Sequence, residues 1–382
     1  MLTDIKSLSE QELRTQFVEW RQPEYRVGQL LEWLYQHRVT NWDAMTNLPK
    51  ALRDQLRAAF SLQSLELVRK QGADDTTQKF LWRLADHSLI ESVLIPANPA
   101  LYGEASDRHT LCVSTQVGCA YGCKFCASGL DGFKRNLGAH EIIEQVLATE
   151  RWGVSSFKGQ VSSGEEKKDD RLETSNLKLK TRLVDNLVIM GMGEPLANYA
   201  NLLKALRILN APWGGGIGAR KITISTSGLA PQIRTLADEP LQFRLAISLH
   251  GATDETRAKI MPVNKKYPLA ELAAACDYYQ QKKERMITFE YILIAGVNDG
   301  LDQVRPLAQL ARRLQAKVNL IPYNRVDGLP WERPADEVSE AFLAALEKHK
   351  VIATLRREKG HDIDAACGQL RLRTERELAG KN

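Results

Sequence analysis

The chain has 382 residues, of which 43% are hydrophobic and 26% are charged, a composition typical of globular proteins with a sizeable core. Its 52 Lys and Arg residues against 47 Asp and Glu give a net charge of +5, which permits a nucleic-acid partner but does not require one. No run of about 18 apolar residues occurs, and the N-terminus lacks the basic and apolar segments of a signal peptide. We therefore expect a cytoplasmic protein with no membrane partner.

The first 60 residues are predicted to form a small helical domain. Apolar residues recur at helical spacing over 11–60, and Pro23 and Pro49 interrupt the run. The pattern leaves two roles open for this domain (1–60): it binds RNA, or it is a packing layer on the main domain.

A β-rich extension follows at 61–104. Its β-like stretches, 79–84 and 90–96, predict a connecting hairpin or a small extra sheet.

Strand-like and helix-like segments then alternate over 105–355. Strands are predicted at 111–117, 186–190, 221–225, 243–249, 288–294 and 317–321. Helices are predicted at 140–151, 199–209, 269–281, 301–314 and 335–349. Six β/α units predict an α/β fold with a parallel sheet, either open or curled into part of a barrel.

One segment, 155–182, departs from this alternation. It is rich in charge and poor in large apolar residues, so it buries too little surface to order itself strongly. We interpret it as an exposed, mobile insertion; a solvated loop is favoured over a binding element.

Cys119, Cys123 and Cys126 form a C-x3-C-x2-C motif. Its short spacing lets three thiolates from one loop hold a [4Fe–4S] cluster, which leaves one of the four irons open for a substrate or cofactor. Zinc sites more often use paired C-x2-C motifs or cysteine with histidine and close all four positions. No such partner lies nearby in the sequence, so structural zinc is the weaker alternative.

Residues that are mostly small or polar gather at the carboxyl ends of four predicted strands. They are Gly193, Glu194, Ser225, Ser248, Leu249, His250 and Asn324. Each alone is more typical of a turn or a cap. Because this edge carries the active site in α/β proteins, their coincidence with the cysteine motif predicts a cofactor site. Glu194 suits an ammonium group, and Ser225 and Asn324 suit ribose or carboxylate.

The cysteine motif, with Phe125 before its last cysteine, resembles the radical S-adenosylmethionine superfamily. Further stretches resemble the RlmN/Cfr family of RNA adenine methyltransferases; they lie at 191–196, 225–228, 248–250, 260–267 and 362–370. This resemblance, from about Pro23 to Leu370, implies a partial (βα)6 barrel with a small helical N-terminal domain. It also implies a [4Fe–4S] cluster on the three cysteines and two molecules of S-adenosylmethionine per turnover, bound at the strand-end residues.

Within the family, 193–196 and 225–228 are similar to the RlmN branch, which methylates carbon 2 of adenine. The alternative is carbon 8 methylation, as in the Cfr branch. Two other classes remain open: a radical enzyme with a small-molecule substrate, and a non-catalytic RNA-binding protein with a structural metal. The small-molecule class has no use for Cys112 together with Cys367, and zinc without iron would indicate the RNA-binding class.

The resemblance implies roles for three further residues. Carbon 2 of adenine is electron-poor and cannot attack a methylsulfonium directly. Cys367, in the C-terminal segment 356–382, would first take a methyl group as a nucleophile, lose hydrogen to a radical made from a second S-adenosylmethionine, and bond to carbon 2. Glu91 would accept the carbon 2 proton, and Cys112 would attack Cys367, form a transient disulfide and free the product.

From the residues alone, Glu91 would be a surface carboxylate on a strand and Cys112 a small buried residue. Cys276, on a predicted helix, matches no family motif and is interpreted as a thiol without a catalytic role.

The implied partners are 23S rRNA near the peptidyl-transferase centre, a subset of tRNAs with an adenine next to the anticodon, and an electron donor of the flavodoxin or ferredoxin type. We expect a monomer. A stacked adenine hides carbon 2, so the base must be splayed or flipped into the barrel mouth. The basic N-terminal helices and 356–359 are candidate phosphate contacts, or else solvated faces.

Overall fold

The computed structural model describes residues 2–72, 77–97, 108–161, 182–356 and 368–379, and for 154–161 the backbone alone. Cys367, most of the insertion predicted at 155–182 and most of the 356–359 stretch lie outside the described residues. Within the described ranges, none of the helices has the length and apolar content needed to span a bilayer.

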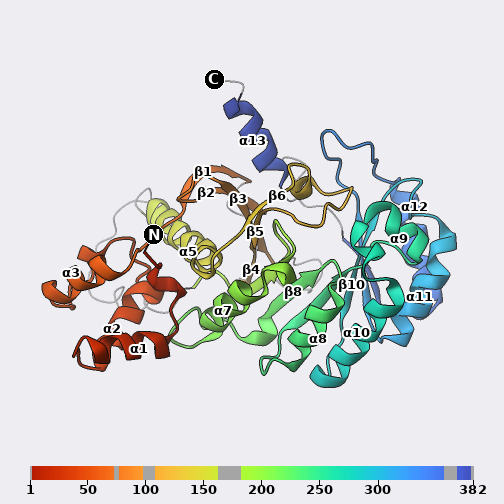
Figure 1. Ribbon diagram of the computed structural model, residues 1–382. Coiled ribbons are helices and arrows are strands. Elements are labelled where there is room, and N and C mark those ends of the chain that lie inside the picture. The colour runs from red at the N-terminus through yellow and green to blue at the C-terminus, as the bar shows by residue number, and fades with distance from the viewer. Residues whose placement is uncertain (1, 73–76, 98–107, 162–181, 357–367, 380–382) are drawn as a thin grey trace.

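One mixed sheet organises the molecule (Figure 1). Its order is β1-β2-β3-β4-β7-β8-β9-β10-β11-β12, with antiparallel pairs from β1 to β4 and parallel pairs from β4 to β12. The strands are β1 (Glu66–Gln71), β2 (Gln78–Arg83), β3 (Leu89–Pro96), β4 (His109–Cys112), β7 (Asn186–Ile189), β8 (Ile222–Thr226), β9 (Arg244–Ser248), β10 (Thr288–Leu293), β11 (Lys317–Pro322) and β12 (Ala353–Leu355). Strands β2 and β3 form the predicted hairpin, and this hairpin continues the main sheet, so the alternative of a small extra sheet was wrong.

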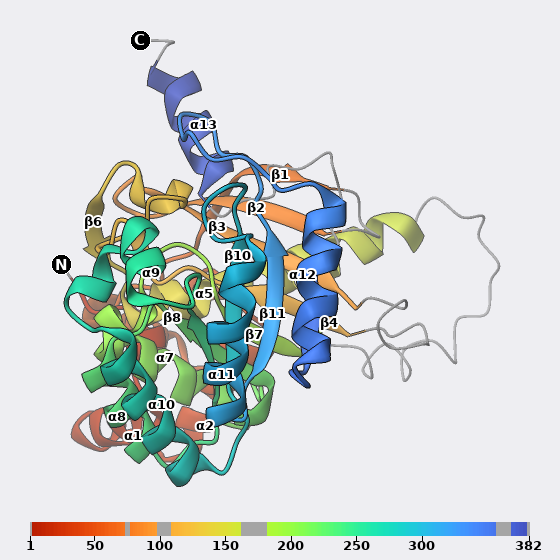
Figure 2. The same ribbon diagram turned by 90° about the vertical axis from the view of Figure 1, so that its right-hand side faces the viewer.

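Helices follow the parallel strands and cover the outer side of the sheet, as both views show (Figure 1, Figure 2). They are α5 (Ala139–Val161), α7 (Tyr199–Asn210), α8 (Ala230–Asp238), α9 (Asp254–Ile260), α10 (Leu269–Lys283), α11 (Val304–Arg313) and α12 (Asp336–Lys348). Short 3-10 turns lie at η4 (Ala127–Gly129), η6 (Pro195–Asn198), η7 (Ala219–Lys221), η8 (Pro262–Lys265) and η9 (Leu301–Gln303). The β-then-α alternation confirms the predicted α/β fold with a parallel sheet. Helix α13 (Gln369–Ala379) lies apart from this layer, beside β1–β3.

The predicted strand 111–117 is two strands in different sheets. After Cys112 the chain leaves the main sheet, and β5 (Gln116–Gly118) pairs with β6 (Phe133–Asn136) in a hairpin. Gly118 has φ +77°, and a Cβ there would lie 1.9 Å from the Gly132 carbonyl oxygen, so only glycine fits this crossing. The apolar run in the sequence is continuous, which is why its periodicity does not reveal the change of partner.

Helix α5 is longer than predicted and anchors the sheet. It continues to Val161, so the first residues of the expected loop at 155–182 are helical, and that boundary was wrong. Its buried Gln145 accepts hydrogen bonds from Ser92 Oγ at 2.9 Å and from Ser114 N at 2.8 Å, and donates to Ser114 O at 2.9 Å. One satisfied buried amide thus fixes β3 against the chain that leaves β4.

The N-terminal helices form the small helical region that was expected. They comprise η1 (Ile5–Ser7), α1 (Glu10–Glu19), α2 (Tyr25–Leu31), the π-helical turn η2 (Glu32–Gln36), η3 (Trp42–Ala44) and α3 (Lys50–Ala59). Lys6, 2% exposed, lies 3.4 Å from Glu144 of α5, and Lys204 of α7 lies 2.9 Å from Glu12. These helices therefore do pack on the barrel. RNA binding by them, and domain boundaries at 60, 104 and 355, stay predictions.

Candidate active site

Two glycines bring the end of β7 against the chain that follows β4. A Cβ at Gly191 would lie 2.6 Å from the Val113 carbonyl, and one at Gly193, where φ is +103°, would lie 2.6 Å from Gln116 Cβ. Only glycine allows this approach. Gln116, 1% exposed, accepts a hydrogen bond from the Glu194 N–H at 2.9 Å and donates to Asn136 at 2.8 Å.

The Glu194 carboxylate links the ends of β7 and β8. It is 3% exposed and accepts bonds from Leu196 N at 3.0 Å, Thr226 Oγ1 at 2.8 Å and Ser227 N at 2.7 Å. Burial raises the pKa of this carboxyl above its ordinary value, and the three donors oppose that shift. Because a carboxylate has about four acceptor sites, three internal bonds leave room for one further donor such as an ammonium.

The ends of the next two strands bring two serines together. Ser225 Oγ and Ser248 Oγ lie 3.4 Å apart on neighbouring strands β8 and β9. Leu249 is fully buried, and its backbone N–H donates to Glu290 O at 3.0 Å, so its side chain supports the site from the core. Asn324, after β11, accepts from Arg333 at 3.3 Å.

His250 is held as a neutral imidazole. Its Nδ1 accepts from the Ile292 N–H at 3.0 Å, so the proton of the neutral ring lies on Nε2. Burial lowers its pKa from 6.5 to about 3. The ring meets Phe125 of the cysteine motif edge to face, with centroids 4.9 Å apart and planes at 85°. His250 therefore joins the β9 end to the cysteine loop.

The cysteine loop is fastened at both ends by its backbone. Cys119 N donates to Gly132 O at 3.1 Å, and Cys126 N donates to Cys123 O at 3.1 Å. Between them, Lys124 N donates to Ile260 O at 2.9 Å, and Lys124 O accepts from Trp331 Nε1 at 2.8 Å. These contacts come from α9 and the chain after β11, so the loop lies over the same edge as the strand-end residues.

The three thiols suit an iron–sulfur cluster by their chemistry. Burial raises the pKa of Cys119 to about 11 and that of Cys123 well above its ordinary value, and ionised neighbouring thiols add to both shifts. Such thiols become thiolates when a cation binds them. Among the described residues, no three Cys, His, Asp or Glu side chains converge as a single metal ion requires, whereas cluster ligands bind separate irons.

Arg257 was missed by the sequence reasoning. Its side chain is fully buried, and it donates to Leu249 O at 3.0 Å, to Asn264 Oδ1 at 2.7 Å and to Ser227 O. Burial lowers its pKa to about 10. One cation thus joins the chain after β8, the chain after β9 and η8. A charged helix residue normally faces water, so no sequence signal distinguished it.

Glu91 and Cys112 lie on one face of the sheet. In the register, Val93 of β3 is directly opposite both Lys79 of β2 and Cys112 of β4, and Glu91 is two residues from Val93. Directly opposite residues, and residues two apart, share a face. The other face carries Ser92 and is covered by α5. Glu91 is 3% exposed and Cys112 5%, so the surface position expected for Glu91 from its pattern was wrong.

The backbone at the start of helix α13 is hydrogen-bonded to the Glu91 carboxylate. Gly368 N donates to Glu91 Oε2 at 2.8 Å, and Arg371 N donates to Oε1 at 2.7 Å. Gly368 has φ +86°, and a Cβ there would lie 2.8 Å from Ser128 Oγ, in the turn directly after Cys126. The residue that follows Cys367 in the chain therefore lies between Glu91 and the cysteine loop.

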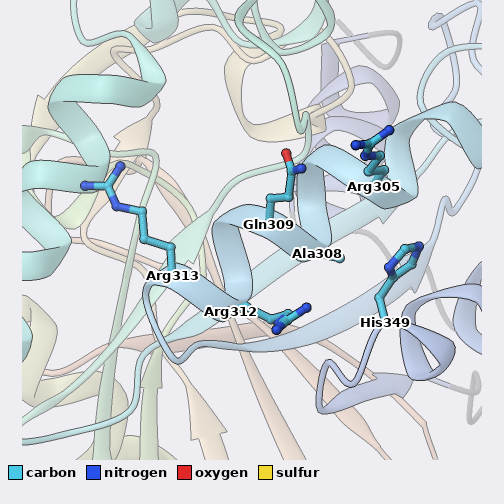
Figure 3. A pocket seen from close by; sticks show the side chains of 6 residues that line it. All are labelled: Arg305, Ala308, Gln309, Arg312, Arg313 and His349. Atoms are coloured by element: carbon cyan, nitrogen blue, oxygen red, sulfur yellow. The ribbon is translucent and has the colours of Figure 1, made fainter.

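A separate surface pocket is formed by other residues. It has a volume of about 480 Å³ and is lined by α11 and the end of α12; the lining residues are Arg305, Ala308, Gln309, Arg312, Arg313 and His349 (Figure 3). It contains none of the predicted site residues and lies on the outer helix layer. Cys276 is also outside the site, fully buried in α10, where burial raises its pKa to about 12.

Comparison with known proteins identifies the family. Residues 3–62 match the model for the ribosomal RNA large subunit methyltransferase N-terminal domain, and residues 113–309 match the radical SAM superfamily. A relative from Opitutus terrae, "Probable dual-specificity RNA methyltransferase RlmN 3", is 54% identical over 93% of this chain and 91% of its own. The chain belongs to the RlmN family of radical S-adenosylmethionine RNA methyltransferases.

Other members agree with this assignment. A protein from Akkermansia muciniphila, "Probable dual-specificity RNA methyltransferase RlmN", is 48% identical over 99% of this chain and 98% of its own. The crystal structure of a radical SAM methyltransferase from Sphaerobacter thermophilus is 40% identical, covers 96% of this chain and 98% of that one, and superposes with a TM-score of 0.83. RlmN enzymes use a [4Fe–4S] cluster and two molecules of S-adenosylmethionine per turnover, which confirms the cofactors expected from the cysteine motif.

Proposed function

We propose that this RNA methyltransferase methylates carbon 2 of adenine in 23S rRNA and in a subset of tRNAs, with the methyl group carried on Cys367. The observation that carries the proposal is that three groups needed for the reaction come together at one face of the sheet. Glu91 and Cys112 share that face, and the residue after Cys367 is hydrogen-bonded to Glu91 at 2.8 Å. A carbon that cannot act as a nucleophile requires a carrier, a base and a resolving thiol, and these residues supply them.

Each residue has a defined task in this scheme. Cys119, Cys123 and Cys126 hold the cluster, which together with S-adenosylmethionine supplies the methyl group and the one-electron chemistry. Cys367 carries the methyl carbon to the adenine and becomes bonded to it. Glu91 accepts the proton of carbon 2 as the adduct gives up one electron. The Cys112 thiolate then attacks the Cys367 sulfur: the disulfide forms as the bond from that sulfur to the methylene breaks, and the methylene takes the bonding pair and a proton to become the methyl group of the released base.

We propose that the strand-end residues bind S-adenosylmethionine. The set is Gly193, Glu194, Ser225, Ser248, Leu249, His250 and Asn324. Support comes from the remaining acceptor position on Glu194, the paired hydroxyls of Ser225 and Ser248, and the Nε2–H donor of the neutral His250. Leu249 would act through packing, since its side chain is fully buried.

The remaining partners are part of the same proposal. The relatives' names specify dual specificity for RNA without naming the RNAs, and we propose that they are 23S rRNA and tRNA. We further propose that the enzyme acts as a cytoplasmic monomer and takes electrons from a flavodoxin or ferredoxin.

The proposal is tested by nucleoside mass spectrometry of ribosomal and transfer RNA from cells that lack the gene, before and after its return. We expect 2-methyladenine to disappear from both RNA classes and then to reappear. A response of 8-methyladenine in its place would assign the chain to the carbon 8 reaction. No response in either RNA would overturn the proposed substrates.

A further inference from the structure

Lys79 lies where a lysine is costly to bury. Its side chain is 1% exposed in β2, directly opposite Val93 and therefore in one row with Cys112 across three strands. An ammonium removed from water is tolerated when a carboxylate and further hydrogen-bond partners surround it. Its Nζ lies 3.1 Å from Glu91 Oε2, and that carboxylate is itself 3% exposed.

The Glu91 carboxylate is held from two directions. On one side, Lys79 of the sheet contacts Oε2. On the other side, at the start of helix α13, Gly368 N donates to Oε2 at 2.8 Å and Arg371 N donates to Oε1 at 2.7 Å. Both views show α13 beside the β1–β3 end of the sheet (Figure 1, Figure 2). The two backbone donors belong to the segment that carries Cys367, whereas Lys79 belongs to the sheet that carries Glu91.

In the reaction proposed above, the backbone donors and Lys79 would differ in how long they stay in contact with Glu91. Cys367 must reach a methyl donor, an adenine and Cys112 in turn, so the chain next to it cannot keep one position throughout. The Gly368 and Arg371 donors move with that chain. Lys79 is fixed by the strand register relative to Glu91 and Cys112, and its contact does not depend on where the Cys367 segment lies.

We propose that Lys79 is a positioning residue, which keeps the Glu91 carboxylate directed at the reacting base when the Cys367 segment leaves its hydrogen bonds with Glu91. The inference rests on the proposed function, because it assigns Lys79 to the proton-removal step. Methyl transfer to Cys367 precedes that step and does not require Lys79. A purely structural lysine would affect all steps alike.

The experiment compares Lys79→Met, Lys79→Arg and wild-type enzyme, each purified anaerobically with its cluster and given an RNA substrate. Three quantities are measured: methylation of Cys367 by protein mass spectrometry, covalent protein–RNA adduct on a denaturing gel, and methylated adenine. For Lys79→Met we expect normal iron content and Cys367 methylation, at least a tenfold slower release of product, and accumulation of the adduct. Lys79→Arg, which restores a cation, should recover a large part of the rate.

Arg83→Met is the matched control. Arg83 lies on the same strand and the same face, in an exposed ion pair with Glu66 at 2.8 Å, so its loss removes a cation without touching Glu91. We expect it to behave as wild type. If Lys79→Met does not fold, Lys79→Gln, which keeps a hydrogen-bond donor, takes its place with the same expected adduct.

Two results would overturn the inference: product release and adduct unchanged in the Lys79 variants, or a parallel loss of iron, Cys367 methylation and thermal stability. Failure of the proposed function has a different signature. In that case wild-type enzyme itself would show no methylated Cys367 and no 2-methyladenine.

Discussion

Gly368 donates its backbone N–H to the Glu91 carboxylate at 2.8 Å, which joins the chain next to Cys367 to strand β3. The bond spans 277 residues of sequence. Because Glu91 and Cys112 share one face of the sheet, this contact brings the carrier segment to the two residues that would complete its reaction.

The resolving thiol gives the first prediction. Cys112→Ala should accumulate a covalent protein–RNA adduct on a denaturing gel, because no second thiol then attacks Cys367 to release the base. Cys276→Ala is the control, since Cys276 is fully buried in α10 outside the site, and its truncation should cost about 1 kcal/mol at most. Normal turnover of Cys112→Ala without an adduct would show that the resolving role is wrong.

Glu91→Gln should slow proton removal by about 100-fold, a typical effect of losing a general base. Methylation of Cys367 should persist, and the adduct should accumulate as in Cys112→Ala. Single-turnover assays of product formation measure the effect. Glu66→Gln on β1 is the control, because Glu66 is an exposed carboxylate paired with Arg83 at 2.8 Å. Equal rates for Glu91→Gln and wild type would exclude Glu91 as the proton acceptor.

Substitution of a cysteine in the cysteine loop should cause a loss of iron that other cysteine substitutions do not cause. Cys119→Ala should lose most of the about four irons per chain expected for a [4Fe–4S] cluster, together with its visible absorption. Cys112→Ala should keep both, since Cys112 lies on β4 outside the loop. Iron analysis after anaerobic purification measures the iron content of both variants. Zinc in place of iron in the wild-type protein would contradict the cluster assignment.

Arg257 predicts a combined effect on stability and cofactor binding. Arg257→Met leaves the Ser227 and Leu249 carbonyls without their buried donor, which should cost about 3 kcal/mol and lower the melting temperature by about 5 °C or more. Binding of S-adenosylmethionine should weaken because both carbonyls lie at the strand ends. Lys259→Met, on the same helix in an exposed pair with Glu255, should change neither. An unchanged melting temperature for Arg257→Met would show that these hydrogen bonds of Arg257 do not stabilise the fold.

His250 predicts how stability depends on pH. Burial lowers its pKa from 6.5 to about 3, so below pH 6.5 the unfolded chain binds a proton that the folded chain excludes. The free energy of unfolding should therefore fall by up to about 1.4 kcal/mol per pH unit between pH 6.5 and 3 from this group.

The comparison uses wild type and His250→Asn, both without the cluster, followed by denaturant unfolding at each pH. Asparagine tolerates the φ of +54° and offers an oxygen to the Ile292 N–H in place of Nδ1. The variant should lose less stability in acid. Identical acid dependence in the two proteins would show that His250 does not exclude the proton.

Much of the fold and site was predictable because the signals are local. Cys119, Cys123 and Cys126 lie within one short loop. Gly193 follows β7 and Ser225 lies near the carboxyl end of β8, and the parallel order of these two strands places both residues at one edge. The α/β order needed only periodicity. The change of sheet after Cys112 and the short strand β12 were missed, because apolar periodicity does not specify which strand is the partner.

By itself, therefore, the sequence determined the α/β class, the ligands for a cluster and membership of a radical enzyme family, since contiguous motifs encode these. Only the tertiary structure decided that Glu91 is buried, that Lys79 and Cys112 stand in one row beside it, and that Arg257 braces the strand ends. These relationships depend on strand register and on contacts between residues far apart in the chain. A register shift of one residue would turn Glu91 to the opposite face, and because Ile90, Glu91 and Ser92 are all buried, the pattern of this strand does not reveal which face Glu91 takes.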